Sequence, residues 1–377
     1  MPMKTELIKQ LTKLVSINSQ YPQEKELGEY IIYTLINTGF KVRKQFIDKT
    51  RFNVLAEKGT GNTSVLFYAH LDTVSIAQGW KTNPHNLTIV GDKAYGLGAW
   101  DMKAGLLANI LAVSNSNPKN TKLKLVFCVD EEYISKGGHA LIKSSFMKDV
   151  ACVISTEPAF QHGVQGIVTG RIGRAVYDVK ISTKSQHFAM YDPKFDINIV
   201  YANFINQIKK LFKKNGDKKQ FIFARSVQST VIGLSIPEKM EFQLDSSVLP
   251  PNTADSILKI LCAIAKRIEV KNNSTFKVEV VKHPRETPFL EPYVVNARNI
   301  YLAALKKSVF AISKKTALPY FRSSVADENI FGAAGFTTLG IGPVGSNAHG
   351  ANEWVSLSSI KELVSILTHF ISLSDEL

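Results

Sequence analysis

The chain has few cysteines and no long apolar run. Its 377 residues include three cysteines, Cys128, Cys152 and Cys262, each isolated in an apolar stretch. Because this is not the even, regularly spaced set of a disulfide framework, we expect buried thiols in a reducing compartment. The first 19 residues place leucine and isoleucine at helical spacing between lysines, which indicates an amphipathic helix rather than a signal peptide or a membrane span. The sequence therefore predicts a cytoplasmic protein without a membrane partner.

Acidic residues are in the minority, with 32 Asp and Glu against 46 Lys and Arg and a formal net charge of +14. Part of the excess lies in one run of six lysines, Lys209, Lys210, Lys213, Lys214, Lys218 and Lys219. A nucleic-acid-binding protein would carry a basic stripe with interleaved aromatic residues or a known binding module, and the sequence has neither. We therefore expect no nucleic-acid partner, and we interpret the lysines as a solvated helix face that also attracts anionic substrates.

Helical and strand-like segments alternate through the first part of the chain. Residues 24–39 and 102–114 have the spacing of apolar residues that is typical of helices. Residues 65–69, 122–129 and 150–155 are short apolar runs, as expected for strands that are buried on both faces. This alternation predicts an α/β fold with a mainly parallel sheet flanked by helices.

The pattern changes from about residue 170. A strand, a helix, two strands, a helix and a strand are predicted in that order, at 175–182, 195–214, 228–234, 239–244, 253–270 and 275–281. This order is typical of a compact α+β unit of about a hundred residues.

The α/β pattern then resumes, with a helix at 293–307, a strand at 337–341 and a helix at 357–373. The small α+β unit therefore interrupts a larger domain. We divide the chain into a first part of the catalytic domain (1–168), an inserted domain (169–282) and a second part of the catalytic domain (283–377).

Histidine and acidic side chains follow three of the predicted strands directly. His70 and Asp72 come after the first, Glu131 and Glu132 after the second, and Glu157 after the third. Because parallel strands present their carboxyl ends at one edge of a sheet, these side chains should meet there. Imidazole and carboxylate groups are ligands that zinc and related divalent cations take in proteins. The placement predicts a two-metal hydrolase, and no pattern of a nucleophilic serine or cysteine competes with it.

A glycine-containing segment, residues 96–101, has two interpretations. It could be a dinucleotide-binding loop, but it ends in Asp101 rather than in a small residue and does not follow the first strand of the chain. We therefore interpret Asp101 as a further acidic ligand of the metal site. His349, late in the chain, supplies the second imidazole.

Five segments in order carry a resemblance to a known family. They are His70-Leu71-Asp72-Thr73-Val74, Tyr95 to Lys103, Asp130-Glu131-Glu132, Glu157-Pro158 and His349-Gly350-Ala351-Asn352-Glu353. With these motifs the chain resembles the M20 family of zinc aminoacylases and metallopeptidases, especially the branch of acetylornithine deacetylase and succinyl-diaminopimelate desuccinylase. The resemblance covers nearly the whole chain and implies a di-zinc exopeptidase-like domain with an inserted ferredoxin-like lid and dimerisation domain.

The resemblance also implies roles for the site residues. Two divalent ions are expected, with zinc the first choice and cobalt or manganese as alternatives. One ion would be held by His70 and Glu157 and the other by Glu132 and His349, with Asp101 bridging them. Asp72 would orient the His70 imidazole. Glu131 would be the general base that activates a water between the metals and passes its proton to the departing amine.

For the inserted domain the resemblance implies a homodimer. His187 would reach the partner's active site and hydrogen-bond the developing oxyanion. Two further positions concern the substrate. Ser247 stands where the family commonly has an arginine near the substrate carboxylate. The stretch around Asp327 and Asn329 is similar to that of N-acetyl-lysine and N-acetyl-ornithine deacetylases, which makes both residues candidates for substrate contacts.

Three functions follow as hypotheses. The first is a di-zinc amidohydrolase that removes an acyl group from a small N-acyl amino acid of the N-acetyl-ornithine, N-acetyl-lysine or succinyl-diaminopimelate type. The second is a dipeptidase, tripeptidase or carboxypeptidase with the same metal site. The third is an inactive relative that binds ligands through the same fold. The presence of all five metal-ligand candidates and of Glu131 favours an enzyme.

Overall fold

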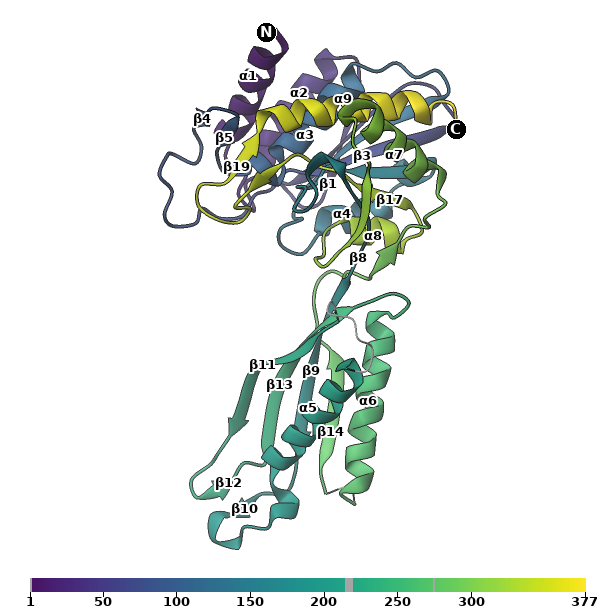
Figure 1. The fold of residues 1–377 in the computed structure, drawn as a ribbon. Helices are drawn as coiled ribbons and strands as arrows, with labels where there is room; N and C mark the ends of the chain where they lie inside the picture. Colours follow the sequence, from purple (N-terminus) through teal and green to yellow (C-terminus); the bar gives the residue numbers. More distant parts are fainter. Residues whose placement is uncertain (1, 214–219, 274) are drawn as a thin grey trace. The chain divides into compact units, whose positions relative to one another are not determined.

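The computed structural model describes residues 2–213, 220–273 and 275–377, so Lys214, Lys218 and Lys219 of the lysine run lie outside the described residues. The chain forms two compact units (Figure 1). The larger unit comprises Met1–Gly170, Val294–Arg322 and Ala326–Leu377, and the smaller unit comprises Arg171–Tyr293 and Ser323–Val325. The sequence division ends the insertion at residue 282, whereas the smaller unit continues to Tyr293.

A nine-stranded sheet lies at the centre of the larger unit. Its strands are β1 Lys41–Phe46, β2 Phe52–Lys58, β3 Thr63–His70, β6 Thr121–Cys128, β7 Val150–Ser155, β8 Gly166–Arg171, β15 Tyr293–Val294, β16 Leu318–Arg322 and β17 Thr337–Gly340. They run in the order β1-β2-β6-β3-β7-β17-β8-β15, with β16 paired to β8. The four central strands, β6, β3, β7 and β17, are parallel, while β2 and β8 join them antiparallel. The predicted, mainly parallel α/β sheet is therefore confirmed.

Helices cover both faces of this sheet, which explains why its central strands are largely apolar and buried. One face packs on α1 Pro2–Ser16, α2 Lys25–Asn37, α3 Ala104–Ser114, α7 Ile300–Ser313 and α9 Leu357–Ser374, and the other on α4 Lys136–Ile142 and α8 Glu328–Ala333 (Figure 1). Successive residues of β3 show the alternation: Phe67 packs in the first core, and Leu66 and Tyr68 pack in the second. Each fully buried side chain of this size contributes roughly 1.5–3 kcal/mol.

A second sheet of the larger unit supports two loops of the candidate site. It contains β18 Gly345–Ser346, β19 Trp354–Ser356, β5 Lys93–Tyr95 and β4 Thr88–Val90, in that order. The segment that leads to Asp101 follows β5, and the loop with His349 lies between β18 and β19. Because β19 pairs with β5, the end of the His349 loop lies beside the start of the segment that leads to Asp101.

The smaller unit is the expected α+β fold. It contains β9 Gly173–Ser182, α5 Ile197–Lys213, β11 Ile222–Thr230, β13 Lys239–Val248, α6 Ala254–Lys271 and β14 Lys277–Lys282. The antiparallel sheet has the order β11-β13-β9-β14, and a two-stranded sheet joins β10 Gln186–His187 to β12 Ser235–Ile236. Alternate residues of β9, Tyr177, Val179 and Ile181, pack in one core with the helices, as in a ferredoxin-like arrangement.

Two predicted elements are wrong in position. The strand predicted at 228–234 is β11, which ends at Thr230. Most of its side chains are exposed, so its sequence lacks the alternation of a half-buried strand. The helix predicted at 293–307 is α7, which begins at Ile300 because the Asn299 side chain accepts hydrogen bonds from the Tyr301 and Leu302 N–H groups.

The three cysteines are free thiols. Cys128 and Cys152 are buried, as expected, but the expectation is wrong for Cys262, which is exposed. Cys262 lies on α6 between the positions that face the core, Leu261 and Ile264 among them. Within the described ranges, no helix combines the length and apolar character that crossing a lipid bilayer requires.

Candidate metal centre

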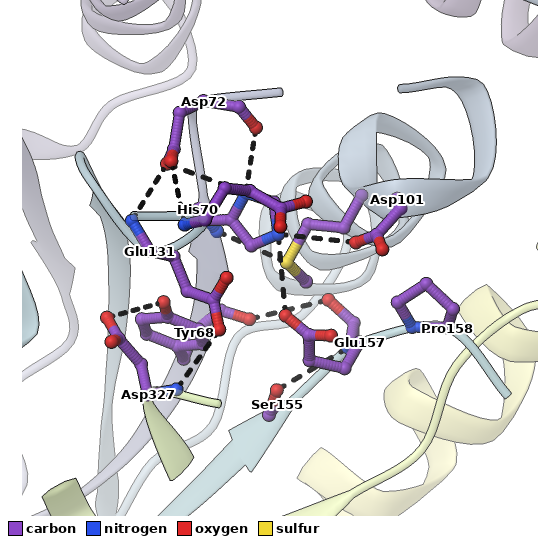
Figure 2. Close-up of polar contacts among 12 residues, drawn as sticks. Tyr68, His70, Asp72, Asp101, Glu131, Ser155, Glu157, Pro158 and Asp327 are labelled. Carbon is purple, nitrogen blue, oxygen red and sulfur yellow. Dashed lines mark hydrogen bonds and ion pairs between the residues drawn. The ribbon is translucent and has the colours of Figure 1, made fainter. Parts of the chain in front are cut away.

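Three neighbouring parallel strands end level with one another at the candidate site. In the sheet register His70 of β3 lies opposite Cys128 of β6, and Tyr68 lies opposite Ser155 of β7. The acidic residues that follow β6 and β7 therefore emerge beside His70 (Figure 2). Helix α3 approaches the end of β7 closely, since a Cβ atom at Gly105 would lie 2.1 Å from the Thr156 carbonyl oxygen.

The five predicted metal ligands come together in two groups that share one aspartate. The groups are His70, Asp101 and Glu157, and Asp101, Glu132 and His349, and the potential ligand atoms within each group lie within 4.8 Å of one another. His70 Nε2 lies 3.3 Å from Asp101 Oδ1 and 3.4 Å from Glu157 Oε1. His349 Nε2 lies 3.4 Å from Asp101 Oδ2 and 3.0 Å from Glu132 Oε1. Each group could hold one cation with N and O ligands.

Electrostatics at this edge of the sheet favour bound cations. Burial and neighbouring carboxylates raise the pKa of Glu131 well above its ordinary value, and burial and the Asp101 charge raise the pKa of Glu132. Hydrogen bonds to Asp101 and Glu132 raise the pKa of His349 to about 10. Burial alone would lower the pKa of His70, but its hydrogen bond with Asp101 and the surrounding carboxylates raise it well above normal. In contrast, hydrogen bonds from His349 and His70 lower the pKa of the buried Asp101. Divalent cations in the two groups would supply positive charge to this cluster of carboxylates.

Glu131 also belongs to a third possible group, with His70 and Glu132. It therefore lies within reach of the site whether it acts as a base or as a ligand. Its carboxylate accepts a hydrogen bond from the Asp327 N–H at 3.3 Å. Tyr68 donates to the Asp327 carboxylate at 2.8 Å, so these two side chains lie directly behind Glu131 (Figure 2).

Asp72 supports the site mainly through the backbone. Its carboxylate accepts hydrogen bonds from the Glu131 N–H at 3.1 Å and the Glu132 N–H at 2.9 Å. The His70 Nδ1 atom lies 2.9 Å from the Asp72 carbonyl oxygen and 3.7 Å from its nearest carboxylate oxygen. The main-chain carbonyl thus orients the imidazole, while the carboxylate fixes the turn that carries the two glutamates.

Asp327 and Asn329 are both fully buried. The Asn329 side chain accepts a hydrogen bond from the Ala326 N–H at 3.0 Å, and burial raises the pKa of Asp327 to about 7. The Asp327 N–H thus helps to hold Glu131, and Asn329 holds the backbone at Ala326.

Sequence reasoning missed Arg51, which is buried behind the two glutamates. Its guanidinium donates to Glu24 at 3.2 Å, to Asp130 at 3.1 Å and to Asp48 at 2.8 Å. Asp130 has a positive φ of 72° and immediately precedes Glu131, so this ion network fixes the start of the acidic turn. A single arginine before a strand carries no motif, and the sequence therefore offered no signal for it.

Glu353 was part of a recognised motif but had no predicted role. The residue is 2% exposed, and its carboxylate accepts hydrogen bonds from the backbone N–H groups of Gly98, Trp100 and Asp101. Burial raises the pKa of Glu353 to about 8. The peptide bond between Asp101 and Met102 is cis.

The two predicted sites of the inserted domain lie in the smaller unit. His187 is exposed in β10, and its Nδ1 accepts a hydrogen bond from the Ala189 N–H at 3.3 Å. Ser247 is fully buried, and its hydroxyl accepts a hydrogen bond from the Phe221 N–H at 2.7 Å. The cross-strand neighbour of Ser247 is Arg174.

Comparisons with known proteins agree with this site. Residues 66–373 match the family described as peptidase family M20/M25/M40. The chain is 31% identical over 201 residues to the acetylornithine deacetylase of Aliivibrio salmonicida (strain LFI1238), a match that spans about half of each protein (51%). It is 25% identical over 380 residues to the succinyl-diaminopimelate desuccinylase of Buchnera aphidicola subsp. Acyrthosiphon pisum (strain Tuc7), covering 95% of each.

Among solved structures, the fold is similar to that of the Bacillus subtilis YXEP protein, described as a dinuclear metal binding peptidase from the M20 family. The TM-score is 0.75, with 14% sequence identity over 99% of this chain and 98% of that chain. The fold and these relatives define a metal-dependent hydrolase of amide bonds. More particularly, the chain belongs to peptidase family M20/M25/M40, which confirms the resemblance drawn from its motifs.

We expect Asp101→Ala to remove most of the bound metal, because Asp101 is shared by both ligand groups. Metal content per chain, measured by mass spectrometry after dialysis, should fall together with hydrolytic activity. Asp375→Ala is the control, since it deletes a carboxylate that follows α9 and caps the backbone of residues 119–121. Metal content at the wild-type level in Asp101→Ala would refute this assignment.

Proposed function

We propose that the chain is a deacylase that removes an acyl group from a small N-acyl amino acid, of the N-acetyl-ornithine, N-acetyl-lysine or succinyl-diaminopimelate type. The observation that carries the proposal is the pair of carboxylate–imidazole groups that share Asp101, with Glu131 beside them. The names of the two curated relatives support the substrate class. The ligand sets suit two divalent ions, zinc first, with His70 and Glu157 holding one, and Glu132 and His349 the other.

The chemistry divides between the cations and the protein. When bound, the two cations would polarise the scissile carbonyl and lower the pKa of water in the site. Glu131 takes a proton from the attacking water and passes it to the departing amine nitrogen as the C–N bond breaks. Its burial suits this task, because a carboxylate shielded from water binds the transferred proton more strongly than an exposed one.

The surroundings of Glu131 keep it in position for both transfers. Asp72 holds its main-chain N–H, and the Asp327 N–H donates to its carboxylate. Tyr68 in turn holds Asp327. This chain of contacts begins on β3 and restricts the Glu131 side chain to one place, which is what proton transfer over a short distance requires.

A peptidase is the second candidate, because the Bacillus subtilis structural neighbour is described as a peptidase. A panel of acetyl-ornithine, acetyl-lysine, succinyl-diaminopimelate, dipeptides and tripeptides would separate the two. We expect kcat/KM to be highest for an N-acyl amino acid, with activity lost on chelation and restored by zinc. A dipeptide or tripeptide as the best substrate would overturn the deacylase assignment, and no hydrolysis by the metal-loaded protein would favour an inactive relative.

We expect Glu131→Gln to retain metal and substrate affinity while kcat falls by roughly 10²–10⁴-fold, the usual scale for loss of a general base. Glu132→Gln is the matched comparison, because it makes the same substitution at the neighbouring residue, which is a candidate metal ligand. This variant should bind less metal. Calorimetric zinc titration and steady-state kinetics distinguish the two variants. If Glu131→Gln loses zinc and its rate per bound zinc is unchanged, Glu131 is a ligand.

We also propose a homodimer, formed through the inserted domain, that works in the cytoplasm, where free thiols stay reduced. Strand β11 lies at an edge of its sheet and offers unpaired backbone groups to a second strand. Exposed apolar side chains cluster in sequence along β11 and near β10 and β12: Phe188, Met190, Phe221, Phe223, Val227, Val231, Ile232 and Leu234. In this dimer His187 serves the partner's active site as an oxyanion donor.

Two inactive variants, His187→Ala and Glu131→Gln, test this arrangement when they are mixed and allowed to exchange subunits. A heterodimer would contain one site with both residues intact, so activity should partly return. By itself His187→Ala should lower kcat more than it raises KM, since an oxyanion donor contributes roughly 2.7–4 kcal/mol to the transition state. The double variant, exchanged with itself, is the control. Verified exchange without recovery would place His187 outside the partner's site.

A further inference from the structure

Glu353 joins the two loops that carry Asp101 and His349. It ends the loop between β18 and β19, and its side chain reaches the segment that follows β5. The Gly98 and Trp100 N–H groups each donate to its carboxylate at 2.7 Å, and the Asp101 N–H donates at 2.9 Å. One carboxylate on the His349 loop thus holds three backbone groups of the Asp101 loop.

Both loops have backbone conformations that need such support. Asn347, His349 and Asn352 have positive φ angles of 66°, 62° and 59°, which non-glycine residues adopt rarely and keep where the surroundings hold them. Gly98 has a φ of 69°, and a Cβ atom there would lie 2.4 Å from the Thr73 side chain. The main chain adds one more tie, from the Gly96 N–H to the Glu353 carbonyl at 3.1 Å.

The three bonds need a carboxylate in particular. Two of the N–H groups, those of Trp100 and Asp101, share one oxygen, and the Gly98 N–H occupies the other. A glutamine would have to place its NH₂ group against one of these donors. A carboxylate offers acceptor lone pairs on both oxygens, so it suits a buried position with three donors.

We propose that Glu353 is a positioning residue that sets the place of Asp101 against His349, and thereby the metal affinity of the group formed by Asp101, Glu132 and His349. The inference rests on the proposed two-metal centre. The other group should depend on Glu353 less, because His70 and Glu157 are placed by the ends of β3 and β7. Both groups share Asp101, but only one of them also contains His349, so Glu353 should affect that cation site more strongly than the other.

Zinc titration of the chelated full-length protein by calorimetry tests this. The wild type should show two binding steps, and Glu353→Gln should weaken one of them by roughly 10–100-fold, the usual effect of losing a partner that orients metal ligands. His349→Ala should weaken the same step, and the double variant should lose no more than His349→Ala alone. At saturating zinc, kcat of Glu353→Gln should recover toward that of the wild type.

Asp375→Asn is the matched control. Its carboxylate also accepts three backbone N–H groups, those of Lys119, Asn120 and Thr121, at 2.7–2.8 Å. It should lower the melting temperature of the metal-free protein without changing either zinc step. If Glu353→Gln does not fold, Glu353→Asp keeps the charge on a shorter side chain and should weaken the same step.

The outcomes separate the two ideas. Unchanged zinc steps in Glu353→Gln or in Glu353→Asp overturn the positioning role, as does an equal loss at both steps or an equal effect of Asp375→Asn. A wild type that binds no zinc overturns the proposed function instead. Weakening of one step only, shared with His349→Ala, supports the inference.

Discussion

The crowding of buried carboxylates at one edge of the sheet is the constraint on which the rest of the larger unit depends. Strands β6, β3 and β7 pair in parallel and end close to one another. The acidic residues that follow these strands therefore lie side by side. Burying like charges together is costly unless protons or cations neutralise them. Burial and neighbouring carboxylates raise the pKa of Glu131 and Glu132, whereas the His349 and His70 imidazoles lower that of Asp101. Two divalent cations at the ligand groups that share Asp101 would neutralise this cluster.

Three buried carboxylates accept hydrogen bonds from backbone N–H groups and thereby hold the loops of this site in place. Asp72 accepts from the turn that carries Glu131 and Glu132, and Glu353 accepts from the loop that carries Asp101. Asp130 accepts from the Lys136 N–H and pairs with Arg51. Each of these contacts fixes main chain, so the ligating side chains keep their own oxygens and nitrogens for cations.

Three of the five candidate ligands, His70, Glu132 and Glu157, lie at recognisable strand ends, so the sequence could predict that they meet. His70 and Glu157 follow continuous apolar runs, and the parallel arrangement of those runs follows from helix–strand alternation. Glu24 and Arg51 could not be found in this way, since they meet from separate segments through a single ion pair at 3.2 Å. The predicted position of the exposed edge strand β11 was wrong for a related reason. A strand with few buried side chains shows no alternation of apolar and polar residues in its sequence.

Burial also bears on which residues can determine the substrate selectivity. An N-acyl amino acid and a short peptide present the same amide carbonyl to the cations and to Glu131, so this chemistry does not distinguish them. Selectivity must come from contacts with groups further along the substrate. Asp327 and Asn329 are fully buried and engaged in holding Glu131 and its turn, and Ser247 is fully buried against the backbone of Phe221. In this structure all three side chains are thus engaged with other residues of the protein.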